Sequence, residues 1–273
     1  MIACIPIAHL HGGETTEGAF DESIRHSITK MSHLHFTATE EYKNRVIQLG
    51  EHPERVFNVG GMGIENIKRL ELLTREAFEE SIRFKLAEKN ILVTFHPVTL
   101  EESTAEEQFQ NLIDAIDELE DTHIIFTKAN SDTDGRVING MIDTYVSKHA
   151  SKSVAFTSLG QLRYLSALQF VDAMVGNSSS GLAEAPSFKI VTINIGDRQK
   201  GRIMAKSVIN CCNDKESIVD AFEKMYTEEF KGILKSLENP YGDGCASTKM
   251  VEEIKKIDLD NILKKSFYDI KVS

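Results

Sequence analysis

The chain has 273 residues, and its 31 lysines and arginines against 42 aspartates and glutamates produce a formal net charge of −11. With 41% hydrophobic and 27% charged residues, the composition is that of an ordinary globular protein and excludes a disordered or collagen-like chain. The acidic balance argues against a nucleic-acid partner, which needs a basic face to meet phosphates, but it is compatible with one anionic ligand held by a few local groups. No apolar run approaches the ~20 residues of a membrane span.

The N-terminal stretch Ile2–Leu10 predicts a buried parallel strand. It lacks the basic region of a secretory signal. The four cysteines (Cys4, Cys211, Cys212 and Cys245) have a spacing that fits no zinc or redox motif. We therefore expect reduced cysteines, no bound metal and a cytoplasmic protein.

Strand-like and helix-like runs then alternate along most of the chain. The further strands are predicted at His35–Ala38, Val56–Val59, Ile91–Phe95, Ile124–Thr127, Val154–Thr157, Ala173–Val175 and Val191–Ile195. The helices are predicted at Asp21–Met31, Glu40–Gln48, Arg75–Leu86, Ala105–Leu119, Arg136–His149, Gln161–Leu168, Leu182–Ser187, Glu216–Met225 and Lys249–Leu263. This rhythm predicts the α/β class, with parallel sheets covered by helices on both faces. Ligands of such folds bind beyond the carboxyl ends of the strands.

The first of these strand ends carries His9–Glu14, followed by Asp21–His26. Its glycines allow a sharp turn and a close approach to a ligand. His, Glu, Asp and Arg lie within a short stretch, and such a cluster can supply an acid/base pair. Either acid at the helix start also fits a simple N-terminal cap. His33 and His35, just beyond, are more typical of structural histidines.

Two other strand ends carry polar residues. His96 follows the run Ile91–Phe95 and is compatible with a structural or a functional role. The stretch Thr127–Gly135, which includes Asn130, is also typical of a local turn.

The most specific segment is Val175–Glu184, in which Gly-Asn-Ser-Ser-Ser-Gly follows a strand and opens a helix. Small residues there expose N–H groups and hydroxyls that suit a diphosphate. The pattern is neither Gly-x-Gly-x-x-Gly nor a Walker loop. Glu184 could accept from ribose hydroxyls or be a solvated acid. The next strand end supplies Gly196–Arg202, where Arg198 could serve a phosphate or a carboxylate.

Together these segments, with Tyr241–Gly244, resemble the hydrolysing UDP-N-acetylglucosamine 2-epimerases of sialic-acid and legionaminic-acid pathways. The resemblance covers essentially the whole chain in order. It implies a glycosyltransferase-B-like fold with one complete Rossmann-like domain and the C-terminal part of a second, truncated one. We expect the partial domain at 1–72, the nucleotide-binding domain at 73–245, and a C-terminal helix at 246–273 that packs back towards the N-terminal domain.

The resemblance also implies the roles of individual residues. Four of them match the nucleotide-binding positions, the serines holding phosphate and the glutamate the ribose: Ser178, Ser179, Glu184 and Arg198. Asn130 looks like a further substrate position, and Arg25 belongs to the same set. His96 matches an active-site histidine near the diphosphate. An active-site carboxylate matches Asp21 or Glu22, of which we favour Asp21.

The reaction implied by the resemblance removes the C2 proton while UDP departs from C1, which produces a 2-acetamidoglucal. Water then adds at C1 and a proton returns to the opposite face of C2, releasing N-acetylmannosamine or an analogue. No cofactor is needed, and a homo-oligomer is expected.

Two departures from the family bear on activity. Several relatives carry glutamate at the position of His11, so His11 has another role or Glu14 compensates, as in members that act on nucleotide-linked diacetamido sugars. The family's preceding strands, about 100 residues with a Gly-Asp-Arg segment, are not seen, so we expect impaired catalysis. The alternatives are a non-catalytic nucleotide-sugar-binding fragment and a glycosyltransferase, and the His-Gly-Gly-Glu segment argues against the latter.

Overall fold

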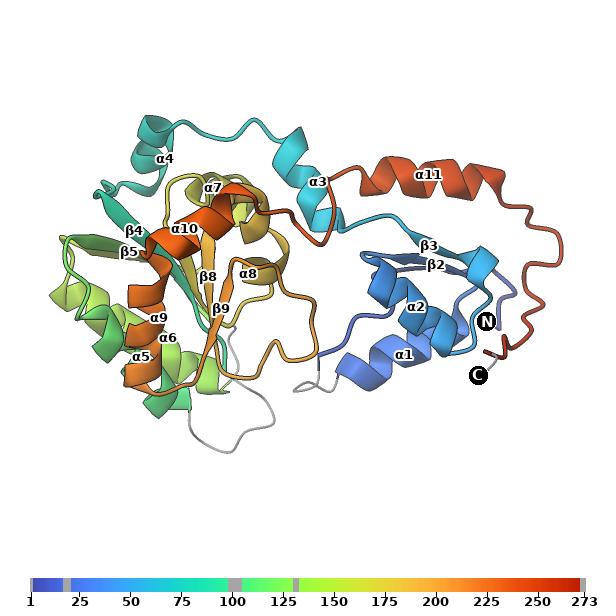
Figure 1. Ribbon diagram of the computed structural model, residues 1–273, viewed down its shortest axis with the longest axis horizontal. Coiled ribbons are helices and arrows are strands. Elements are labelled where there is room, and N and C mark those ends of the chain that lie inside the picture. Colours follow the sequence, from blue (N-terminus) through green and yellow to red (C-terminus); the bar gives the residue numbers. More distant parts are fainter. Residues whose placement is uncertain (1, 17–20, 98–104, 130–132, 271–273) are drawn as a thin grey trace. The chain divides into compact units, whose positions relative to one another are not determined.

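The computed structural model describes residues 2–16, 21–97, 105–129 and 133–270, without the side chains of Asp21 and Thr133. The chain divides into two compact units (Figure 1). Unit 1 consists of residues 1–69 and 239–273, and unit 2 consists of residues 70–238. Within the described ranges no helix is long and apolar enough to span a membrane.

Unit 2 is built on a six-stranded sheet in which every neighbouring pair of strands is parallel. Its strands are β4 (Lys89–Thr94), β5 (Thr122–Thr127), β6 (Ser153–Phe156), β7 (Ala173–Gly176), β8 (Val191–Ile195) and β9 (Val208–Cys211). Their order across the sheet is β6-β5-β4-β7-β8-β9. The strand order therefore reverses between β4 and β7, and this switch point is where doubly wound sheets bind ligands.

Helices cover both faces of this sheet because its strands are apolar on both sides. Ile91 and Val93 of β4 belong to a buried cluster with α5 (Ala105–Ile116), α6 (Thr133–Lys148) and α9 (Lys215–Met225). Leu92 and Met174 are equally buried but point to the opposite face by strand alternation. On that face lie α7 (Gly160–Ala167) and α8 (Ser180–Ala183) (Figure 1).

Unit 1 contains a three-stranded parallel sheet in the order β1-β2-β3. The strands are β1 (Ala8–Leu10), β2 (Leu34–Thr37) and β3 (Val56–Asn58), connected by α1 (Asp21–Met31) and α2 (Glu40–Gln48). The helices α3 (Met62–Arg69) and α11 (Ala246–Lys256) complete the unit. Ala246 and Met250 of α11 share a buried cluster with Leu34 and Phe36 of β2, so the C-terminal helix packs on unit 1.

The division between the units falls earlier in the chain than the boundaries at 72 and 245 expected from the sequence. Residues from Asn239 onwards belong to unit 1 because they already pack there. Gly61 N–H donates to the Tyr241 carbonyl at 2.7 Å, and the Tyr42 and Tyr241 hydroxyls lie 3.2 Å apart.

The α/β class with parallel sheets is confirmed, but several predicted elements change. The first strand spans only Ala8–Leu10 and leaves Ile2 and Ile5 exposed, so the prediction of a buried strand from Ile2 is wrong. Pro6 lacks the N–H that a strand ladder needs. The predicted helix Arg75–Leu86 is α4 (Arg75–Ile82), which ends at Arg83 in a left-handed conformation (φ 52°).

Other predicted helices shift at their ends, and one strand and two α-helices of the described chain were not predicted. The helix predicted at Lys249–Leu263 lies at Ala246–Lys256, and the one predicted at Leu182–Ser187 is α8 followed by a 3₁₀ turn at Ala185–Phe188. The sequence did not predict β9, α3 or α10 (Glu228–Lys235).

Candidate functional site

The strands β4 and β7 end side by side at the switch point of unit 2, with Thr94 opposite Gly176 in the parallel register. Gly176 has a φ of +130°, and a Cβ atom there would overlap the carbonyl oxygen of Thr94. Only glycine tolerates both the conformation and the close approach. The chain after β7 is thereby held against the end of β4, where the Asn177 N–H donates to the Thr94 carbonyl at 3.2 Å.

A pair of hydrogen bonds joins the two loops that leave these strands. The His96 N–H donates to Asn177 Oδ1 at 2.7 Å, and Asn177 Nδ2 donates to the His96 carbonyl at 2.7 Å. Asn177 is only 1% exposed, whereas His96 is half-buried. The structure thus places His96 next to the serine-containing loop, as a functional site at the switch point requires.

The serine-containing loop leads directly into α8. Ser178 and Ser179 are half-buried, and the Ser179 carbonyl accepts the Leu182 and Ala183 N–H groups. Glu184 ends this single helical turn and begins the 3₁₀ turn. Because α8 has only four residues, a diphosphate there would depend on local N–H groups and hydroxyls more than on a helix dipole.

Tyr164 supports the serine-containing loop from α7. Its hydroxyl donates to Ser180 Oγ at 2.6 Å and lies 3.2 Å from the sulfur of Met174. Burial raises the pKa of the Tyr164 phenol above its usual value, although the hydrogen bond with Ser180 lowers it. The phenol is therefore a neutral hydrogen-bonding group near neutral pH.

The loop after β8 also reaches the switch point. Arg198 Nη1 and Gln199 Nε2 both donate to the Asn177 carbonyl, at 2.9 and 2.7 Å. Three loops, after β4, β7 and β8, therefore meet at Asn177. Along the β8 loop lies a pocket of about 380 Å³, whose lining includes Gly196, Asp197 and Lys200.

In unit 1 the loop after β1 gathers His11, Glu14 and Arg25. His11 Nδ1 lies 3.0 Å from Glu14 Oε1, and Arg25 Nη1 lies 3.7 Å from Glu14 Oε2. Glu14 is buried, and Arg45 Nη1 donates to the Gly13 carbonyl at 2.6 Å. A buried carboxylate flanked by an imidazole and a guanidinium is suited to proton exchange.

The second acidic position of unit 1 is only partly described. Glu22 accepts the Thr16 N–H at 2.8 Å with one oxygen and lies 3.0 Å from His26 Nε2 with the other. Asp21 begins α1, but its side chain lies outside the described part of the chain, as does Asn130. The choice between Asp21 and Glu22 therefore stays a prediction.

Three further histidines lie in the interior of unit 1: His9, His33 and His35. Burial, with the nearby charges of His35, Arg25 and His11, lowers the pKa of His9 to about 4, so His9 is neutral near pH 7. His35 Nε2 lies 2.9 Å from Glu51, which also binds Lys30 and Lys265. These contacts agree with a structural role for His35.

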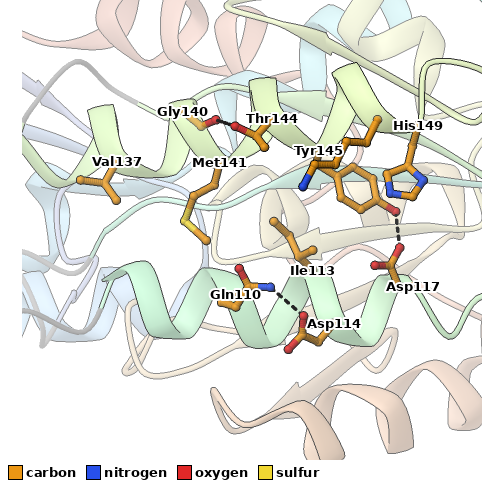
Figure 2. A pocket seen from close by; sticks show the side chains of 11 residues that line it. Gln110, Ile113, Asp114, Asp117, Val137, Gly140, Met141, Thr144, Tyr145 and His149 are labelled. Atoms are coloured by element: carbon orange, nitrogen blue, oxygen red, sulfur yellow. Dashed lines mark hydrogen bonds between the residues drawn. The ribbon is translucent and has the colours of Figure 1, made fainter.

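A larger groove of about 520 Å³ lies elsewhere in unit 2, between α5 and α6 (Figure 2). Ile113 and Met141 contribute apolar surface, while Tyr145 donates to Asp117 at 2.8 Å and stacks on His149. None of the residues predicted for the site lines this groove. It is therefore not the candidate site. Among the described residues no cluster of His, Cys, Asp or Glu could hold a metal ion.

Sequence reasoning assigned no role to four residues that shape these loops: Asn177, Gln199, Tyr164 and Arg45. Asn177 and Gln199 stand inside the segments that the sequence singled out, but only the strand order shows that those segments meet. Tyr164 and Arg45 lie on helices, and nothing in their local pattern distinguishes them from other half-buried polar residues.

The sequence model of the family described as UDP-N-acetylglucosamine 2-epimerase matches residues 1–255. A relative from Campylobacter jejuni, described as GDP/UDP-N,N'-diacetylbacillosamine 2-epimerase (hydrolyzing), is 43% identical over 271 residues, covering 99% of this chain and 70% of the relative. Polysialic acid biosynthesis protein P7 from Escherichia coli is also 43% identical over 271 residues, covering 97% of this chain and 68% of the relative.

Solved structures show the same fold at lower identity. UDP-GlcNAc 2-epimerase from Neisseria meningitidis bound to UDP-GlcNAc matches with a TM-score of 0.79 at 18% identity, covering 94% of this chain and 71% of that one. UDP-GlcNAc 2-epimerase from Methanocaldococcus jannaschii in complex with UDP-GlcNAc and UDP matches with a TM-score of 0.74 at 20% identity, covering 93% of this chain and 70% of that one. With a family match over residues 1–255 and relatives at 43% identity, the chain belongs to the UDP-N-acetylglucosamine 2-epimerase family.

Proposed function

We propose that this chain is a hydrolysing 2-epimerase of a nucleotide-linked 2-acetamido sugar. The observation that carries the proposal is the meeting of three loops at the switch point of unit 2, which gathers His96, the serine-containing loop and Arg198. Hydroxyls, backbone N–H groups and cationic or hydrogen-bonding side chains are the groups that hold a diphosphate.

In this proposal unit 2 holds the nucleotide. Ser178 and Ser179 donate to the phosphates, and Glu184 accepts from the ribose hydroxyls. Arg198 and His96 stabilise the charge that develops on UDP as its bond to C1 breaks, and this is the step at which preorganised donors contribute most. Asn130 is proposed as a further substrate contact.

The proton transfers are assigned to the acids of unit 1. Asp21, or Glu22 in its place, takes the C2 proton, and the electron pair left at C2 forms the C1–C2 double bond as UDP leaves with the C1–O bonding pair. Water then adds its oxygen to C1, the electron pair of the C1–C2 double bond takes a proton on the opposite face of C2, and the proton that the water gives up replaces it on the donating acid. Glu14, held by His11 and Arg25, is proposed to exchange a proton in this second step, with Arg25 also contacting the sugar.

The sugar is proposed to be a diacetamido sugar or N-acetylglucosamine, on a UDP carrier. The name of the Campylobacter jejuni relative favours the diacetamido sugar, as does the histidine at position 11. A sialic-acid or legionaminic-acid pathway, a cytoplasmic location and a homo-oligomer are further parts of the proposal, and they rest on the family resemblance.

The second candidate is a nucleotide-binding protein that does not catalyse the reaction. It is favoured by one observation: all the described groups proposed for the nucleotide belong to unit 2, whereas the acids belong to unit 1. In this candidate, nucleotide binding would need the groups of unit 2 and not a complete set of acid/base groups.

Calorimetry with UDP tests the nucleotide site. A Ser178→Ala/Glu184→Ala double variant should lose UDP binding, whereas the exposed control Ser236→Ala/Glu238→Ala should bind like the unchanged protein. Release of UDP from UDP-N-acetylglucosamine or UDP-N,N'-diacetylbacillosamine is then measured. Binding with release supports the epimerase, and binding without release supports the second candidate. Absence of UDP binding in the folded unchanged protein contradicts both.

A further inference from the structure

We propose that Asn177 is a positioning residue, whose side-chain amide sets where the His96 imidazole stands relative to the serine-containing loop. This inference rests on the proposed function, since it gives His96 a role towards the diphosphate. Nothing in the sequence pattern assigns a role to the Asn177 side chain, which is too buried, at 1% exposure, to be a surface polar group.

The hydrogen bonds of Asn177 define the orientation of its amide. Oδ1 accepts the His96 N–H and Nδ2 donates to the His96 carbonyl, both at 2.7 Å. In a flipped amide, the NH2 group would face the His96 N–H and the oxygen would face the His96 carbonyl, so only one orientation satisfies both hydrogen bonds. The peptide groups on both sides of the His96 Cα are thereby held, and with them the direction of the Cα–Cβ bond from which the imidazole extends.

The backbone of Asn177 is held independently of its side chain. Its N–H donates to Thr94, and its carbonyl accepts from Arg198 and Gln199. Gly176 allows the tight approach to β4 that these bonds require. The amide therefore extends from a rigid base, and it is the only described side-chain link between Asn177 and the loop that carries His96.

Only asparagine has both the size and the hydrogen-bonding groups for this position. Aspartate has the same shape, but it offers a second oxygen to the His96 carbonyl, so one bond is replaced by repulsion. Alanine leaves a buried N–H and a buried carbonyl without their partner, which is costly where water is excluded.

Gln199 provides a matched control. It is also a 1% exposed amide, and it also hydrogen-bonds to Asn177, but through the Asn177 carbonyl. Within the described chain its Oε1 has no hydrogen-bond partner. Gln199→Leu therefore removes a buried amide of the same neighbourhood while leaving both bonds to His96 in place.

The first test measures UDP affinity by calorimetry in a double-mutant cycle. We expect Asn177→Ala and Asn177→Asp each to weaken UDP binding about tenfold, the loss that corresponds to one or two buried hydrogen bonds. Added to His96→Gln, Asn177→Ala should weaken binding less than about twofold, because its effect passes through His96. Gln199→Leu and His96→Gln should instead combine additively. Additive losses for Asn177→Ala and His96→Gln, or unchanged binding in Asn177→Asp, overturn the inference.

The second test does not need UDP. The imidazole signals of His96 are assigned in proton–carbon NMR spectra by their loss in His96→Gln. They should move in Asn177→Asp and Asn177→Ala and stay in place in Gln199→Leu. Unmoved signals in a folded Asn177→Asp protein contradict the positioning role. Failure of the unchanged protein to bind UDP contradicts the proposed function alone, so the two failures are distinguishable.

Discussion

Two half-buried tyrosines of unit 2 provide a matched pair for testing how the serine-containing loop is supported. Tyr164 donates to Ser180 at 2.6 Å, whereas the Tyr226 hydroxyl has no hydrogen-bond partner among the described residues. Burial is the main cause that raises the pKa of both phenols. Changing each to phenylalanine removes one oxygen and leaves the ring, so the two variants differ mainly in the hydrogen bond that is lost.

The two variants should change the free energy of unfolding differently. Tyr164→Phe loses a net hydrogen bond and leaves the Ser180 hydroxyl without its donor, which should lower the free energy of unfolding by about 1–2 kcal/mol. Tyr226→Phe removes a desolvated hydroxyl that is not hydrogen-bonded to the described chain, so the free energy of unfolding should stay the same or rise by up to about 1 kcal/mol. For a domain of this size, 1 kcal/mol corresponds to a shift in Tm of roughly 2–4 °C.

Because the chain has no tryptophan, far-UV circular dichroism is the suitable probe of thermal unfolding. UDP calorimetry adds a functional measurement, in which Tyr164→Phe should bind a few-fold more weakly and Tyr226→Phe should bind unchanged. Equal stability losses in the two variants, or tighter UDP binding by Tyr164→Phe, would refute the reasoning.

Three further predictions concern single positions. Gly176→Ala should abolish UDP binding and lower Tm, because an alanine at this φ costs roughly 1–2 kcal/mol and its Cβ atom would overlap the Thr94 carbonyl oxygen. A melting curve and a calorimetric titration like those of the unchanged protein would contradict this prediction. Glu51→Gln should lower the free energy of unfolding in urea by about 3–5 kcal/mol, because it removes the buried carboxylate that Lys30 and Lys265 share. Glu41→Gln, in an exposed ion pair, should lower it by at most about 1 kcal/mol, and similar losses in the two variants would contradict a buried ion cluster at Glu51. Folding lowers the pKa of His9 from 6.5 to about 4, so between these pH values the unfolded chain binds a proton that the folded protein does not. The stability of unit 1 should therefore decline by up to about 3 kcal/mol as the pH falls from 6.5 to about 4. His9→Asn should remove this decline in urea titrations, and an unchanged pH dependence would disprove the prediction.

The strands of unit 2 show where sequence patterns suffice. The predicted strand Val191–Ile195 coincides with β8, and Ile124–Thr127 lies within β5, because runs of β-branched residues buried on both faces are a strong local signal. β9 was not predicted because Val208–Cys211 is a short edge strand in which only Ile209 is buried. Its pairing with β8, a tertiary contact, makes it a strand.

The first strand shows the opposite error. The apolar residues Ile2, Ile5 and Ile7 suggested a long buried strand, but pairing with β2 begins at Ala8, just after the Ile7 carbonyl accepts the His33 and Leu34 N–H groups. Hydrophobicity alone carries no information about which backbone groups find partners, and Pro6 removes one donor.

The sequence by itself determined the α/β class, the family resemblance and the segments in which polar residues follow buried strands, because periodicity and turn residues act over a few neighbouring positions. Only the tertiary structure decided that the loops after β4, β7 and β8 meet, and that Asn177 joins them. The physical reason is that these contacts depend on strand order. His96 and Asn177 are 81 positions apart in the chain, and no local pattern records which strands become neighbours in the sheet.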